Sequence, residues 1–300
     1  TVSNVHVTDI QWWGISVTGS YVTVSDSEFD HTSLENTGAT APSWCASDST
    51  TGQDQAAGML SEHIVFERLH VHDVWGEGII LALCDTCIAR NNRIHDCSNN
   101  MMYFDNARNS VFEGNTIWMT NWATYCPSGT RTQAISVANE NWMDSHSWIP
   151  DTNLTIRNNI GINTGTSLAY AAFCNYYSDI HIVHNTFWNC VGWGFWYMAA
   201  TVGGHNANSE LRNNIFYNDG SGSAFYLASQ DAAGWTIASN AWYGLSSLPV
   251  SDTGTTTSIA INSSTSPNNV FASACTNFGT SQLDPTCYKP QQGTNGLVYQ

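Results

Sequence analysis

The chain has 300 residues, with 24 acidic side chains against only eight Lys and Arg, and a formal net charge of -16 at pH 7. This balance argues against nucleic acids and anionic membrane surfaces as partners, because both bind clustered cations. No apolar run approaches the ~20 residues of a membrane span, so membrane insertion is not expected. The nine Cys residues suit an oxidising compartment, and we expect a secreted, extracellular protein.

Period-two alternation of apolar and polar residues predicts short β-strands throughout residues 1–245. Two apolar columns recur along these strands, five residues apart. The first column contains Val7, Val24, Phe66, Ala89, Phe112, Ile156, Ile182, Leu211 and Ile237. The second column contains Trp12, Phe29, Val71, Ile94, Ile117, Phe187, Phe216 and Trp242. Most spacings fit a repeat of 22 to 26 residues, which predicts a solenoid built from stacked turns, here called rungs.

An asparagine follows the first column by three residues in six repeats. Its members are Asn92, Asn115, Asn159, Asn185, Asn214 and Asn240. Asparagine tolerates left-handed backbone and its amide can bond the neighbouring rung, so we predict a ladder at a bend. With the motifs at 90–96, 113–117 and 211–216, the chain resembles the pectate-lyase-like right-handed parallel β-helix superfold. The resemblance covers residues 1–245 and implies an all-β solenoid similar to extracellular carbohydrate-processing proteins, without specifying an activity.

Charged residues of opposite sign also recur at the same position of successive rungs. The predicted stack contains Glu67, Arg90, Glu113 and Arg157, and a separate pair joins Asp85 to Arg108. Each stacked pair favours the register by a few tenths of a kcal/mol. We therefore interpret these side chains as structural and not catalytic.

One residue beyond the second column, a row of side chains is predicted to point outward. It contains Trp13, Asp30, His72, His95, Trp118, Trp188, Tyr217 and Tyr243, and a one-residue slip at 160–162 interrupts it. Exposed aromatic faces offer stacking surfaces for sugar rings, so we predict that His72, His95 and Trp118 contact a glycan. The competing interpretation is that inserted loops cover the row and make it a second small core.

His70, His72 and His95 share this outer side, and three imidazoles could ligate a metal. Spacing fixes no fourth ligand, so a polar turn is the favoured interpretation and we predict no metal site. Carboxylates on the outer side could hold Ca²⁺, although no dense acidic loop selects a position. The sequence requires no cofactor.

A carboxylate pair is the strongest candidate for chemistry. Tyr103 and Asp105 are predicted to point outward, with Ala82 and Val137 beside Asp105, and Glu140 opens an insertion after the next strand. Rung geometry places the two carboxylates roughly 5 to 10 Å apart, which spans the separations found in glycosidases. We predict Asp105 and Glu140 as the catalytic pair of a hydrolase acting on neutral or mildly charged polysaccharide. Its substrate-binding side chains would be Tyr103, Trp142, His146 and Trp196.

A polysaccharide lyase is less favoured, because a lyase needs a cation to neutralise a uronate and the helix contains no lysine. The alternative from another class is a non-catalytic structural or adhesive subunit of an extracellular filament, wall or coat. Sparse charge and an odd Cys count suit end-to-end self-association of such helices. Glycan acceptor sequons at Asn153 and Asn262 add weak support for an extracellular location.

Two insertions and the C-terminal segment complete the organisation. Residues 32–57 and 121–132 are rich in Ser, Thr and Gly and carry Cys45 and Cys126, which a disulfide could join. Beyond residue 245 the repeat fades. We predict that residues 246–300 form an irregular cap packed on the last rung.

Overall fold

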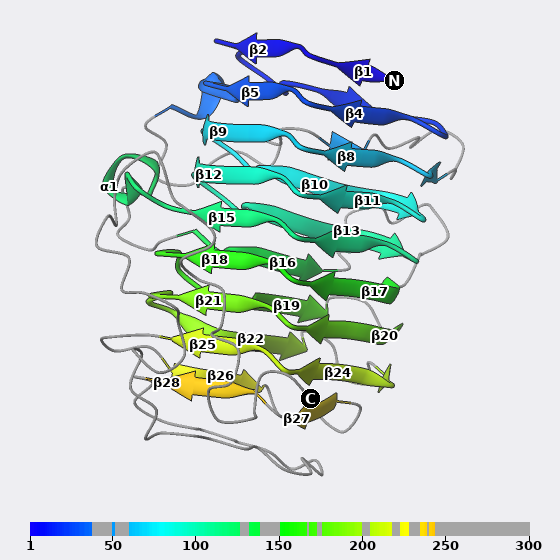
Figure 1. Cartoon of the computed structure of the whole chain (residues 1–300), viewed down its shortest axis with the longest axis vertical. Helices are drawn as coiled ribbons and strands as arrows, with labels where there is room; N and C mark the ends of the chain where they lie inside the picture. Colours follow the sequence, from blue (N-terminus) through cyan, green and yellow to red (C-terminus); the bar gives the residue numbers. More distant parts are fainter. Residues whose placement is uncertain are drawn as a thin grey trace, which may run out of the picture.

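The computed structural model describes residues 1–37, 50–51, 60–126, 132–138, 151–166, 168–172, 176–199, 205–217, 223–227, 235–238 and 240–243. Within these ranges the chain forms short parallel strands, with helical turns only at η1 (Leu34–Asn36) and α1 (Trp122–Tyr125). Figure 1 shows the strands stacked in successive layers from the N-terminus downward. In the described part of the chain, no helix has the length and apolar character to cross a membrane.

A nine-stranded parallel sheet forms one side of the solenoid. Its strands are β2 (His6–Thr8), β5 (Glu28–Asp30), β9 (His70–Val74), β12 (Arg93–Cys97), β15 (Thr116–Trp118), β18 (Ile160–Ile162), β21 (Thr186–Trp188), β25 (Ile215–Tyr217) and β28 (Ala241–Tyr243). Each strand pairs with its equivalent in the next rung, so residues separated by one repeat become lateral neighbours.

A nineteen-stranded parallel sheet covers the remaining sides. Its strands are β1 (Val2–Ser3), β3 (Ser16–Val17), β4 (Thr23–Ser25), β6 (Thr50–Thr51), β7 (Ser61–Glu62), β8 (Val65–Glu67), β10 (Ile79–Asp85), β11 (Ile88–Arg90), β13 (Met102–Arg108), β14 (Val111–Glu113), β16 (Ile135–Ala138), β17 (Asp151–Arg157), β19 (Leu168–Ala172), β20 (Tyr176–Val183), β22 (Trp193–Ala199), β23 (His205–Ala207), β24 (Ser209–Arg212), β26 (Ser223–Leu227) and β27 (Trp235–Ala238). Its long strands bend where one residue takes left-handed backbone, as at Leu83, Asn106, Asn153 and Asp179.

The predicted columns are confirmed, except in the first rung. Val2 pairs with Val24, whereas Val7 pairs with Phe29, so Val7 belongs to the second column and Trp12 to neither. The error arose because the alternation around Val7 fits either column equally well. With Val2 in place, the first rung has the same five-residue step between columns as the rungs below it.

The predicted slip at 160–162 is wrong. Gly161 lies in the inward column between Ile117 and Phe187, and Ile162 continues the outer row between Trp118 and Trp188. The inward position takes glycine because the Phe187 ring fills its space: a Cβ on Gly161 would lie 2.6 Å from Cδ1 of Phe187. The register is therefore continuous, and the Phe187 ring of the next rung fills the space beside Gly161.

The predicted asparagine ladder is confirmed and lies inside the solenoid. Both the backbone N–H and Nδ2 of Asn115 donate to Oδ1 of Asn159, at 3.0 and 2.9 Å. Nδ2 of Asn159 in turn donates to the backbone oxygen of Phe112 at 3.0 Å. The left-handed backbone falls on the preceding residue, such as Asn91 or Asn158, and not on the ladder residue itself.

The predicted ion pairs are also confirmed. Carboxylate and arginine side chains of neighbouring rungs meet at 2.6 Å for Glu67–Arg90, 3.0 Å for Glu113–Arg157 and 2.8 Å for Asp85–Arg108. These pairs lie on the outer side of the nineteen-stranded sheet, where each charge also fixes the lateral register.

The described cysteines are all free and buried. They are Cys84, Cys87, Cys97, Cys126 and Cys190. Cys126 is a thiol whose Sγ lies 3.1 Å from Oγ1 of Thr132, and its suggested disulfide partner Cys45 lies outside the described residues. Strands continue to Tyr243, while the predicted cap at 246–300 lies outside the described residues.

Candidate functional site

Asp105 lies on the outer side of β13, as predicted, but with different neighbours. It pairs with Ala82 of β10 and Ala138 of β16, whereas Val137 pairs with the inward-pointing Phe104. The sequence alignment of β16 was shifted by one residue, because 133–138 offers apolar side chains at both alternations. Asp105 is only 5% exposed and Tyr103 is buried beside it among apolar residues.

The structure does not test the other members of the predicted carboxylate site. Glu140, Trp142, His146 and Asn262 lie outside the described residues. Trp196 is part of β22, opposite Ala169 and Tyr226. Asn153 is exposed at the bend of β17, where its side chain donates to Asn109 at 2.9 Å.

Sequence reasoning missed a buried carboxyl close to Asp105. Asp151 begins β17 inside the solenoid, and its Oδ1 accepts the backbone N–H of Ala107 at 2.8 Å. Complete burial raises the pKa of Asp151 well above its usual range, and the neighbouring Asp105 raises it further. Burial therefore favours the protonated form of Asp151, whose bond to Ala107 supports the bend of β13.

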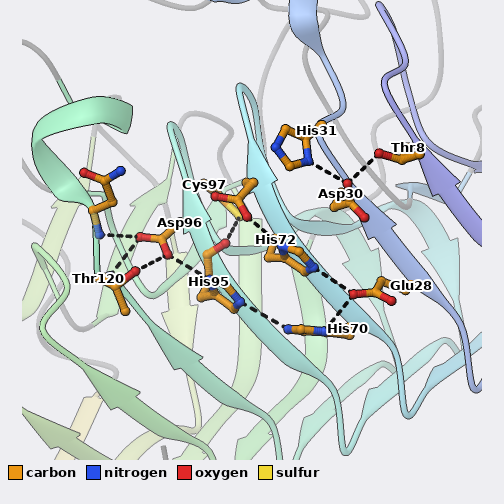
Figure 2. A network of polar contacts seen from close by, with 12 residues as sticks. Thr8, Glu28, Asp30, His31, His70, His72, His95, Asp96, Cys97 and Thr120 are labelled. Atoms are coloured by element: carbon orange, nitrogen blue, oxygen red, sulfur yellow. Dashed lines mark hydrogen bonds and ion pairs between the residues drawn. The ribbon is translucent and has the colours of Figure 1, made fainter. Parts of the chain in front are cut away.

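The described residues converge instead on the outer side of the nine-stranded sheet, at its N-terminal rungs (Figure 2). Glu28 lies opposite His70, and Asp30 lies opposite His72, which in turn lies opposite His95. We call the group the polar cluster. Its members are His6, Glu28, Asp30, His31, His70, His72, Asp73, His95 and Asp96.

His72 stands between two carboxylates. Its Nδ1 lies 2.7 Å from Oδ2 of Asp73, and its Nε2 lies 3.0 Å from Oε1 of Glu28. Burial lowers the pKa of His72, but the hydrogen bonds with Asp73 and Glu28 outweigh it and raise the pKa above its usual value. The same Glu28 oxygen lies 3.3 Å from Nδ1 of His70.

His70 has the opposite electrostatic environment. Burial, together with the neighbouring His72, His95 and Arg93, lowers the pKa of His70 to about 4. Its Nε2 lies 3.1 Å from Nε2 of His95. His70 is therefore a neutral imidazole at neutral pH, with its two ring nitrogens directed at Glu28 and His95.

His95 is held by Asp96. Nδ1 of His95 lies 2.8 Å from Oδ2 of Asp96. The backbone N–H groups of Thr120 and Asn121 both donate to Oδ1 of Asp96 at 2.8 Å. Burial raises the pKa of Asp96, but the bonds from His95, Asn121 and Thr120 outweigh it and lower the pKa below its usual value. The carboxylate is therefore ionised and fixes the orientation of the His95 ring.

Asp30 anchors the upper edge of the cluster. It accepts the Thr8 hydroxyl at 2.6 Å, contacts Nδ1 of His31 at 2.6 Å and also contacts Nε2 of His6. Partial burial of Asp30 raises its pKa, but the bonds from Thr8, His6 and His31 outweigh it and hold the pKa well below the usual range. Asp30 is a fully ionised carboxylate whose acceptor positions are largely used.

The predicted exposed aromatic row is wrong at its centre. The row begins with Thr8 and not Trp13, because Thr8 is the residue that pairs with Asp30. The ring of His95 stacks on Trp118 with centroids 4.3 Å apart, and Trp118 packs with Ile162 in a small buried core. The competing interpretation, a second core, therefore describes this part of the row.

Exposed indoles instead border the polar cluster. Trp12 is 58% exposed, and its backbone oxygen accepts the N–H of Ser33, two residues beyond His31. Trp122 is 41% exposed and begins α1, directly after Asn121. Figure 1 shows α1 beside the ends of β12 and β15. The backbone of each exposed tryptophan thus lies at the end of the nine-stranded sheet where the strands of the polar cluster end.

Two comparisons with known proteins define the class. The description "right handed beta helix region" matches residues 1–204, which confirms the predicted handedness and superfold. The chain belongs to this right-handed β-helix family. No curated protein sequence matches the chain.

The similar solved structures are distant. The tailspike of Escherichia coli bacteriophage HK620, solved with a pentasaccharide, is 13% identical with a TM-score of 0.46; the match covers 82% of this chain and 47% of the tailspike. The Streptococcus pneumoniae adhesin PfbA is 12% identical with a TM-score of 0.45, covering 76% of each chain. Pectate lyase Pel9A is 9% identical with a TM-score of 0.39, covering 94% and 75%. The match spans about half of the length of the tailspike.

Proposed function

We propose that this protein is extracellular and binds polysaccharide along the N-terminal rungs of the nine-stranded sheet. The observation that carries the proposal is the position of the exposed indoles of Trp12 and Trp122 beside the polar cluster. Indole faces pack against the C–H faces of sugars, and carboxylates and imidazoles bond their hydroxyls. Rungs repeat about every 4.8 Å, so an extended glycan can meet the same kind of group on successive rungs.

Binding is tested with a glycan panel and the variants Trp12→Ala and Trp122→Ala. Each should weaken binding of the best glycan about tenfold, equivalent to about 1.4 kcal/mol. Tyr21→Ala is the matched control, because Tyr21 is also exposed but stacks on His63 at another corner. Equal affinity of all three variants and the wild type would remove this surface from consideration.

We further propose that the polysaccharide also contacts the outer side of β13, on the nineteen-stranded sheet, and is hydrolysed there by Asp105 and Glu140. The support is the position of Asp105 on the outer side of β13, opposite Ala82 and Ala138, with Glu140 two residues beyond Ala138 in the sequence. Asp105→Asn and Glu140→Gln should each lower turnover at least ~100-fold. Asp9→Asn, an exposed first-rung change, should leave it unchanged.

The same assays separate the hydrolase from an adhesive or structural subunit. A hydrolase releases new reducing ends from the glycan it binds, and the two amide variants abolish this release. A protein that binds glycan without releasing reducing ends, or that assembles into ordered filaments when pure, would instead be adhesive or structural.

A further inference from the structure

We propose that Glu28, His70 and His72 form a binding site for a divalent first-row transition metal ion such as Zn²⁺. The site goes beyond the proposed glycan function and does not depend on it. It is built from two adjacent strands, with the two histidines on the same outer side of β9 and Glu28 opposite His70 on β5.

The separations between the ligand atoms fit a metal ion. Oε1 of Glu28 lies 3.3 Å from Nδ1 of His70 and 3.0 Å from Nε2 of His72. The three ligand atoms all lie within 4.8 Å of one another. Zinc–nitrogen and zinc–oxygen bonds of about 2.0–2.1 Å in a tetrahedron place ligand atoms about 3.3 Å apart. Small rotations of the side chains are enough to admit the ion.

Proton positions on His72 point to a cation at this place. Asp73 is an acceptor, so Nδ1 of His72 carries the hydrogen that bonds Oδ2 of Asp73 at 2.7 Å. In neutral His72 the Nε2 atom then has a lone pair and no hydrogen. This lone pair faces Oε1 of Glu28, which is also an acceptor.

The same reasoning applies to His70, whose ring is oriented by Asp96 through His95. Asp96 accepts the hydrogen on Nδ1 of His95, so Nε2 of neutral His95 is an acceptor. Nε2 of His70, 3.1 Å away, must therefore donate to it. Nδ1 of His70 is left with a lone pair, which also faces Oε1 of Glu28.

With both histidines neutral, three acceptor atoms thus converge on one space. A cation placed there satisfies all three, and it is either a metal ion or a proton on Nε2 of His72. Asp73 and Asp96 would act as supporting carboxylates, holding the metal-bound imidazole of His72 directly and that of His70 through His95. The neighbouring group of His6, Glu28 and Asp30 is less suited, because Asp30 already accepts from Thr8.

An ion can reach this site from solvent. The side chains of Glu28 and His70 are 42% and 29% exposed. Three protein ligands leave a fourth tetrahedral position open, as in zinc sites that bind water or substrate. Two imidazoles and one carboxylate favour a transition metal over Ca²⁺ or Mg²⁺, which prefer oxygen ligands.

The test is a titration of the full chain with Co²⁺, followed by displacement with Zn²⁺. Cobalt distinguishes this site from the free thiols, since thiolate ligands give intense charge-transfer absorption and nitrogen and oxygen ligands do not. We expect one ion per chain without a thiolate band. On adding Zn²⁺, the nitrogen NMR signals of His70 Nδ1 and His72 Nε2 should shift.

Three variants and a matched control sharpen the result. Glu28→Gln and His72→Gln should weaken cobalt binding at least ~100-fold, and Asp73→Asn about 10- to 100-fold. His181→Gln is the control, because His181 pairs with Glu210 at 2.9 Å on the other sheet and is not part of the polar cluster. Circular dichroism and thermal unfolding confirm that each variant is folded. Absence of binding, binding with a thiolate band, or equal affinity of every folded variant would overturn the proposal, leaving a proton on His72 as the cation.

Discussion

The asparagine ladder and the polar cluster are both columns of side chains that bond across rungs, yet they differ in how their hydrogens are distributed. In the ladder, Asn115 donates to Asn159, and Asn159 donates to Asn185 with the same geometry. An amide side chain carries both a donor and an acceptor, so the asparagine of each rung forms hydrogen bonds with the asparagines of the rungs on both sides. In the cluster, His95 and His72 donate to the carboxylates of Asp96 and Asp73. The ring nitrogens on the other side of the network then face Oε1 of Glu28, which is also an acceptor.

On this difference we base the assignment of the ladder to structure and the proposal that the polar cluster is a binding site. A self-satisfied buried network stabilises one register and has nothing left to bind. A partly exposed network that ends in facing acceptors can take up a cation, and it presents groups that can bond a ligand. The rung geometry is common to both columns, so the residue types alone determine the outcome.

The largest expected effect comes from breaking the ladder. Asn159→Ala removes the acceptor for two donors of Asn115 and leaves the Phe112 carbonyl without its bond. Each stranded buried group costs about 1–3 kcal/mol, so the free energy of unfolding should fall by about 3–5 kcal/mol. Denaturant unfolding measures it.

The control for the ladder is Asn99→Ala, at an exposed position. It should change the free energy of unfolding by no more than about 0.5 kcal/mol. A similar small loss for Asn159→Ala would mean that the ladder is an accessory and not the main structural column.

A smaller effect is expected from the inward column at Gly161. Gly161→Ala places a Cβ 2.6 Å from the Phe187 ring, which is itself stacked on Phe216. Overpacking of this kind costs about 1–3 kcal/mol. Adding Phe187→Leu should recover part of the loss, and a double-mutant cycle by thermal unfolding measures the coupling. Additive losses would show that the two residues do not share the space.

The smallest effect belongs to the outer ion pairs, and it depends on pH. The bond from Arg90 lowers the pKa of Glu67, whose ordinary value is 4.5, and burial opposes it only partly. Because the folded pKa lies below the unfolded one, the stabilisation is present at neutral pH and is lost as pH falls through the folded pKa. Glu67→Gln should cost at most about 1 kcal/mol at pH 7.

This difference should shrink as the pH falls below the ordinary glutamate value of 4.5, whereas the cost of Asn159→Ala should stay constant. The free energy of unfolding of both variants and the wild type, measured at several pH values, gives the two costs for comparison. A pH-independent cost for Glu67→Gln would mean that packing, and not charge, stabilises the pair.

Much of the fold could be predicted because a repeat makes one sequence signal recur many times. Phe66, Phe112 and Ile156 fix the column together, and a single ambiguous residue such as Val7 does not disturb the others. The wrong predictions of register lie where the residues of a single rung had to fix the alignment. At Gly161 the inward position has no side chain to mark it, because the Phe187 ring of the next rung fills the space.

The polar cluster was predictable only in part. Placing Phe29 and Val71 in one column already puts Glu28 beside His70, although the two are 42 residues apart in the sequence. The convergence of lone pairs could not be predicted, because it depends on ring orientations set by Asp73 and Asp96. Asp105 was placed on the correct side of β13, but its burial depends on surroundings that a strand alignment does not give.

The most direct measurement is hydroxyl-radical footprinting of the protein with and without the best glycan of the panel. The account predicts that Trp12 and Trp122 become protected from oxidation, while Tyr21, which is more exposed than either, keeps its rate. Protection of Tyr21 with unchanged rates at Trp12 and Trp122 would contradict the assignment of the polar cluster and its bordering indoles as the ligand-binding surface.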